Sequence, residues 1–163
     1  MALVQRTMAA PREAVFAVLS NGWSYSDWVV GAVHVRAVDE RWPQPGAVIH
    51  HETGPWPVSL HDRTVSLRCE PPSLLVVSPH LWPLGEAVVS IALEEAGPDR
   101  TVVAIEEEFP RGPLRWLRST VNDLALHFRN HESLRRLEDL AIRRTEPADG
   151  DTVRAAMGRT NQE

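Results

Sequence analysis

The chain has 163 residues, 43% of them hydrophobic and 24% charged, which is enough for one domain with a substantial core. Seventeen basic residues, all arginine, against 22 acidic residues give a net charge of −5, which disfavours nucleic acid as a partner. The single cysteine, Cys69, excludes an internal disulfide and a cysteine-based metal site. No export signal and no apolar stretch of membrane-spanning length is visible, so we expect a cytoplasmic protein without stable membrane insertion.

The first thirty residues predict a strand followed by two short helices. Loose alternation over 2–8 predicts the strand, and Pro11 with Glu13 predicts the start of the first helix. Asn21 and Gly22 predict its end, and a second short helical piece is expected around 24–30.

From Val33 to Phe109, short β-rich runs alternate with turns that contain proline or glycine. They predict six strands in an antiparallel meander, over 33–38, 47–53, 58–69, 74–78, 87–93 and 101–109, with a loop over 79–85. Within 58–69 the apolar positions change phase near Asp62 and Arg63, which predicts a bulge there.

The segment from Gly112-Pro113 to about Arg144 is rich in leucine, arginine and glutamate and predicts the longest helix. Residues 1–144 are therefore the expected domain, and the polar segment 145–163 is expected to be a frayed or disordered tail. A strongly bent sheet curves faster than one helix can follow, so we expect a cavity between the two. Its aliphatic and aromatic walls would suit an apolar or amphipathic small molecule.

Several short sequence motifs resemble those of a known superfamily. They are Ala10-Pro11-x-Glu13-x-Val15-Phe16, Ser26-Asp27-Trp28, Asp62-Arg63-Thr64-Val65 through Glu70-Pro71-Pro72, Trp82-Pro83-Leu84-Gly85, and Thr101-Val102 through Glu107. With the element order, they resemble the START-like helix-grip superfamily over about residues 2–143, in particular the bacterial SRPBCC or polyketide cyclase/dehydrase group. The resemblance implies an α+β helix-grip fold, in which a curved antiparallel sheet of about seven strands wraps around a long C-terminal helix. It also implies a hydrophobic ligand cavity, and it carries no shared catalytic signature.

The candidate cavity residues follow from the alternation of side chains along each strand and from the apolar face of the long helix. If Val103 and Ile105 face inward, so does Glu107, which could act as an acid or base or hold a ligand hydroxyl; alternatively it is solvated or paired with an arginine of the long helix. The full candidate lining is Val89, Ile91, Val103, Ile105, Glu107, Leu117, Val121, Leu124, Phe128 and His131.

Two histidines complete the candidates for chemistry. His50 and His51 point to opposite faces of their strand, and the more apolar set of alternate residues makes His51 the better cavity residue. His51, Glu107 and His131 could form a proton-transfer group if the fold brought them together. His127 and His131 have metal-compatible spacing but no evident third ligand, so neither a metal nor a cofactor is expected.

Three functions remain open from the sequence. The first is binding or transfer of a hydrophobic or amphipathic small molecule, lipid-like or polyketide-like, in the cavity. The second is a cofactor-free cyclase or dehydratase in the same cavity, and the third is a protein-interaction module. The sequence leaves undecided whether any reaction is catalysed and what the oligomeric state is.

Overall fold

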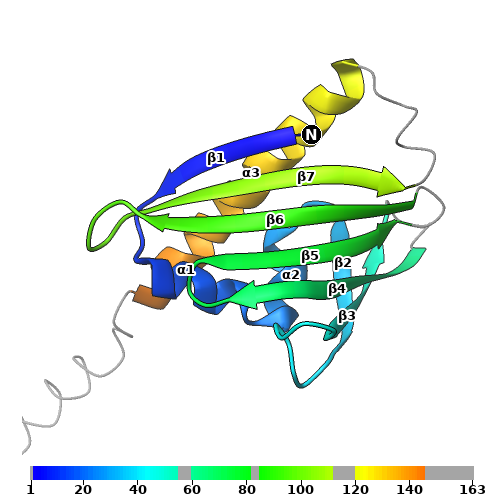
Figure 1. The fold of residues 1–163 in the computed structure, drawn as a ribbon, viewed down its shortest axis with the longest axis horizontal. Helices are drawn as coiled ribbons and strands as arrows, with labels where there is room; N and C mark the ends of the chain where they lie inside the picture. The colour runs from blue at the N-terminus through cyan, green and yellow to red at the C-terminus, as the bar shows by residue number, and fades with distance from the viewer. Residues whose placement is uncertain (1, 55–59, 82–84, 112–119, 146–163) are drawn as a thin grey trace, which may run out of the picture.

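The computed structural model describes residues 2–54, 60–81, 85–111 and 120–145. Its seven strands form one antiparallel sheet in the order β1-β7-β6-β5-β4-β3-β2, and helix α3 crosses one face of it (Figure 1). The elements are β1 (Ala2–Met8), α1 (Arg12–Leu19), the 3-10 helix η1 (Gly22–Ser24), α2 (Tyr25–Trp28), β2 (Ala32–Val38), β3 (Val48–Thr53), β4 (Leu60–Glu70), β5 (Leu74–Leu81), β6 (Gly85–Glu95), β7 (Thr101–Arg111) and α3 (Thr120–Thr145). The predicted α+β class, the strand number and the long C-terminal helix are confirmed. Of the predicted tail over 145–163, Thr145 is the last residue of α3 and the rest lies outside the described residues.

The sheet is a meander that the N-terminal strand completes. Strands β2 to β7 pair in chain order, and β1 pairs with β7, so the first and last strands lie side by side. Helix α3 packs against β1, α1 and α2. It is therefore held by elements from the first thirty residues as well as by the sheet.

Several element boundaries differ from the sequence prediction, among them the end of the first helix and the loop before β6. Helix α1 ends at Leu19, and Asn21 instead caps the following turn by accepting a hydrogen bond from the backbone of Trp23. Strand β5 continues through Pro79 to Leu81, which shortens the predicted loop over 79–85. This is possible because the β5–β6 pairing is interrupted between residues 77 and 80, where a proline without an N–H group costs no ladder hydrogen bond.

The bulge in β4 also lies later than predicted. The register with β5 shifts between Ser66 and Arg68, not near residues 62–63. Before the shift, Asp62, Thr64 and Ser66 are buried, while Leu67 is exposed. The inward face of β4 is thus polar. The apolar residues from which the bulge was predicted are therefore not the buried ones.

The core lies between the sheet, α1 and the C-terminal half of α3. Its fully buried members on α3 are Leu134, Leu137 and Ala141, and the sheet and α1 contribute Met8, Val15, Val18, Ile91, Leu93 and Val103. No helix within the described segments is long and apolar enough to cross a bilayer.

The N-terminal half of α3 does not pack as predicted. Leu124 and Phe128 were expected to face the sheet but are 55% and 66% exposed. Figure 1 shows the first turns of α3 projecting past the edge strand β1, so little of the sheet lies beneath them. Leu117 and the side chain of Val121 fall outside the described part of the chain.

Candidate functional site

A cavity of about 330 Å³ lies between the sheet and helices α2 and α3. This volume falls at the lower end of the range for ligand pockets. The apolar part of its lining is Trp28, Val29, Val30, Ala32, Leu60, Val77, Pro79, Val89, Ile91 and Ile105. The polar part is Tyr25, His51, Thr53, Asp62, Glu107, Arg129, Asn130 and Ser133.

Most of the predicted cavity residues on the strands border this cavity, whereas the described ones on α3 do not. The strand residues Val89, Ile91, Ile105, Glu107 and His51 all border this cavity. Val103 is fully buried but is not among the lining residues.

Helix α3 presents polar side chains to the cavity in place of the expected stripe. Leu124, Phe128 and His131 are exposed and do not line it, whereas Arg129, Asn130 and Ser133 do. An i, i+4 relation places Asn130 above Leu134 and Ser133 above Leu137, which are both fully buried. That spacing from buried leucines was the sequence signal for these two residues, and selecting only apolar residues missed it.

Glu107 is a buried carboxylate with a complete set of partners. Its side chain is 1% exposed, and Nη2 of Arg129 donates to both of its oxygens at 2.7 and 2.6 Å. Nδ2 of Asn130 donates a third hydrogen bond at 3.1 Å. The geometry therefore corresponds to the alternative in which Glu107 pairs with an arginine of the long helix. The pair ties β7 to α3 and neutralises the carboxylate at the cavity wall.

A hydrogen-bonded chain runs along another wall. Nε2 of His51 lies 2.9 Å from Oγ1 of Thr64, and the Tyr25 hydroxyl lies 3.0 Å from the same oxygen. The Tyr25 and His51 rings face each other with centroids 5.1 Å apart. Burial lowers the pKa of His51, with the Asp62 carboxylate acting in the opposite direction, and burial raises the pKa of Tyr25. Both groups are therefore neutral near pH 7.

The contacts among Tyr25, Thr64 and His51 allow more than one arrangement of hydrogens. If Tyr25 donates to Thr64 and Thr64 donates to Nε2 of His51, both contacts are satisfied and the imidazole hydrogen lies on Nδ1. Nδ1 is buried and has no hydrogen-bond partner among the described residues. With the hydrogen on Nε2 instead, Oγ1 of Thr64 can accept from both His51 and Tyr25, and Nδ1 then carries an unpaired lone pair in place of an unpaired hydrogen.

The wall beside His51 has one more polar pair. Asp62 lies directly opposite His51 in the β3–β4 register, and Oγ1 of Thr53 donates a short hydrogen bond to Oδ2 of Asp62. Asp62 is itself 6% exposed. Its carboxylate is thus satisfied on the cavity side of the sheet.

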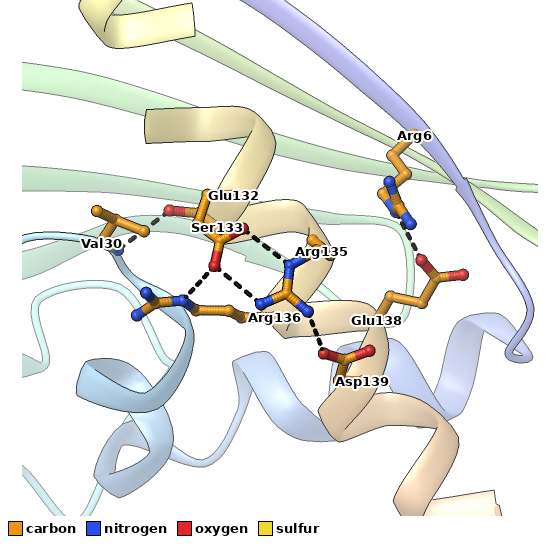
Figure 2. A network of polar contacts seen from close by, with 8 residues as sticks. All are labelled: Arg6, Val30, Glu132, Ser133, Arg135, Arg136, Glu138 and Asp139. Atoms are coloured by element: carbon orange, nitrogen blue, oxygen red, sulfur yellow. Dashed lines mark hydrogen bonds and ion pairs between the residues drawn. The ribbon is translucent and has the colours of Figure 1, made fainter. Parts of the chain in front are cut away.

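Two further contacts fix the position of α3, as Figure 2 shows. Nε of Arg6 donates to Oε2 of Glu138 at 2.6 Å, which joins β1 to the helix. The backbone N–H of Val30 donates to Oγ of Ser133 at 3.1 Å, which joins the segment after α2 to the same helix. These contacts hold the face that carries Arg129 and Asn130 against the cavity.

Glu132 organises the exposed side of α3. It accepts hydrogen bonds from Arg135 and Arg136, and these bonds lower its pKa to about 2 (Figure 2). The pair His127 and His131 lies on the exposed side too, with ring centroids 6.3 Å apart. His131 is thus separated from the cavity that His51 and Glu107 border. Within the described segments, no group of three or more His, Cys, Asp or Glu side chains could hold a metal ion.

The comparisons with known proteins concern the fold. No protein-family model and no curated protein matches the sequence. Protein MLL2253 from Mesorhizobium loti is similar in structure, with a TM-score of 0.67 at 18% identity over 90% of this chain and 98% of that one. Ara h 8.0201 matches with a TM-score of 0.63 at 12% identity over 86% of this chain and 95% of that one.

A third solved structure is a larger protein. DynU16, from the dynemicin biosynthetic locus, has a TM-score of 0.61 at 17% identity over 85% of this chain. The match spans 45% of DynU16, so this chain corresponds to about half of that protein. Likeness at these identities establishes a common architecture.

Proposed function

Given that the chain has the helix-grip fold of the START-like (SRPBCC) superfamily, we propose that it binds or transfers a hydrophobic or amphipathic small molecule, lipid-like or polyketide-like, in the cavity. The observation that carries the proposal is the cavity of about 330 Å³ with a mainly apolar lining between the sheet and α3. A chain that filled this space with its own side chains would have no room for such a ligand.

The polar groups of the lining favour a largely apolar ligand. Glu107 and Asp62 already have hydrogen-bond partners, so an apolar body would not leave them unpaired. An aromatic group buries about 150–250 Å². At ~25 cal/mol per Å² that burial contributes about 4–6 kcal/mol before the costs of association. The proposal assigns no metal, cofactor or nucleic acid, and it places the protein in the cytoplasm, consistent with its single cysteine.

Two neighbouring residues of β6 provide a matched test. Val89 lines the cavity and Val88 points to the other face, so Val89→Trp fills the cavity while Val88→Trp adds the same bulk outside it. The probe is the neutral fluorophore N-phenylnaphthylamine. We expect saturable fluorescence enhancement with the wild type and the Val88 variant, and at least tenfold weaker binding with the Val89 variant. Equal binding by both variants, or none by the wild type, would reject the proposal. Native mass spectrometry of freshly purified protein would show whether a compound is retained.

The chain Tyr25–Thr64–His51 favours a second candidate, a cofactor-free cyclase or dehydratase that uses the same cavity. The His51→Gln variant should then bind the retained compound but no longer convert it, as judged by mass analysis after incubation. A carrier would return the same compound unchanged from both proteins.

A further inference from the structure

A second recess lies on the opposite face of the sheet, away from the cavity and from α3. We call it the outer recess; its volume is about 300 Å³. Alternation places its residues outside, because His50 and Arg63 are exposed whereas their neighbours His51 and Asp62 are buried. The residues that line it are Arg36, His50, His61, Arg63 and His80, together with the buried Asp62, which also borders the cavity on the other face.

The strand registers bring these side chains into one row. His50 of β3 lies directly opposite Arg63 of β4, and Arg63 lies directly opposite His80 of β5. On the other side of His50, the irregularity between Val35 and Ala37 of β2 places Arg36 beside the row. Because neighbouring strands are ~4.8 Å apart, the two arginines are about 10 Å apart across β3. Two guanidinium groups extended from these positions can reach one small ion above His50.

The carboxylates around the row do not neutralise the arginines. Glu52 lies 3.5 Å from Nε2 of His61, and Glu86 lies 3.3 Å from Nδ1 of His80. The Asp62 carboxylate is bonded to Thr53, a residue of the cavity on the other face. Neither Arg36 nor Arg63 forms an ion pair within the described parts of the chain.

Arg36 and Arg63 lie on β2 and β4, which β3 separates, so they are not a directly opposed pair of like charges. Both guanidinium groups nonetheless lack a carboxylate partner among the described residues, and both flank His50. Unpaired arginines on either side of one imidazole provide the donors that an anionic ligand requires.

We propose that the outer recess binds a phosphate dianion, either free inorganic phosphate or the monoester group of a small molecule or a lipid headgroup. Arg36 and Arg63 donate in the forked geometry that suits phosphate oxygens, and His50 lies between them as a further donor. The site lies across the sheet from the cavity, and Asp62 borders both.

The test is an NMR titration of the ¹⁵N-labelled protein at constant ionic strength, with chloride replaced stepwise by inorganic phosphate. Arg36→Gln and Arg63→Gln each remove one proposed donor, and Arg100→Gln removes the same charge from the exposed turn between β6 and β7. We expect saturable shifts at His50 and Arg63 in the wild type and in the Arg100 variant. Each of the other two variants should bind at least fivefold more weakly, and the double variant should not bind.

Two further probes distinguish the source of the phosphate. Phenyl phosphate tests a soluble ester, and vesicles of phosphatidylcholine with or without phosphatidic acid test a lipid headgroup by co-sedimentation. Binding of any of the three phosphate species that is lost in the double variant and kept in the Arg100 variant supports the proposal. If none of the three binds saturably, or if all variants bind alike, the outer recess is not a phosphate site.

Discussion

Removing Arg129 should destabilise the protein far more than removing an exposed arginine of the same helix. Arg129→Met leaves the Glu107 carboxylate, 1% exposed, with only the hydrogen bond from Asn130. Breaking a fully buried ion pair costs about 3–5 kcal/mol, whereas an exposed pair contributes about 0–1 kcal/mol. The Arg129 side chain is 32% exposed, so solvent screening reduces the buried value. We therefore expect a loss of about 2–3 kcal/mol in the free energy of unfolding.

Urea unfolding measures this loss directly. With a slope of about 2 kcal/mol per M, the midpoint should fall by about 1–1.5 M. Arg136→Met is the matched control, because its partner Glu132 is on the exposed side of α3, and it should change the free energy of unfolding by less than about 1 kcal/mol. Adding Glu107→Gln to Arg129→Met should restore part of the loss, because the unpaired charge is then absent. Equal effects of the two arginine substitutions, without such recovery, would refute the reasoning about the buried pair.

Three further predictions concern other parts of the fold. On α3, Leu134→Ala should lower the free energy of unfolding by about 2–5 kcal/mol and Phe128→Ala by less than about 0.5 kcal/mol, because only the Leu134 side chain is buried. Similar values for the two variants in urea unfolding would contradict the orientation of the helix. Gly22→Ala should cost about 1–3 kcal/mol in the same assay, since an added Cβ would lie 2.6 Å from Cγ1 of Val38, and an unchanged midpoint would show that this contact relaxes freely. The pKa of His51 is lowered by burial from an ordinary value of 6.5, so the neutral imidazole stabilises the fold fully above pH 6.5 and this contribution is lost as the pH falls through the lower, folded-state pKa. A ¹⁵N NMR titration should show His51 titrating below pH 6.5, and His51→Gln should reduce the acid sensitivity of the urea midpoint; a His51 pKa above 6.5 would contradict its burial.

The sheet was largely predictable because its pattern is local. Alternation in β6 identified the face that carries Val89 and Ile91, and the parity of Val103, Ile105 and Glu107 in β7 identified an inward carboxylate. Such parity needs no knowledge of the partner strand. Turn residues and the leucine-rich C-terminal segment predicted the order of elements and the closing helix, and the family resemblance implied that the sheet wraps around that helix.

The rest depended on information that no local pattern contains. Leu124 and Phe128 are exposed because the first turns of α3 extend past the sheet edge, which is a consequence of packing. The outer recess depends on a register that sets His50, Arg63 and His80 opposite one another, and single-strand alternation does not fix that register.

The most direct test of the cavity is an isotope-filtered NOE experiment on the protein with labelled methyl groups and unlabelled N-phenylnaphthylamine. The account predicts contacts from the probe to the methyls of Ile91 and Ile105, which line the cavity, and none to the exposed methyls of Leu3 and Val33. Contacts confined to the exposed methyls would place the probe on the surface, and the cavity would then not be the ligand site.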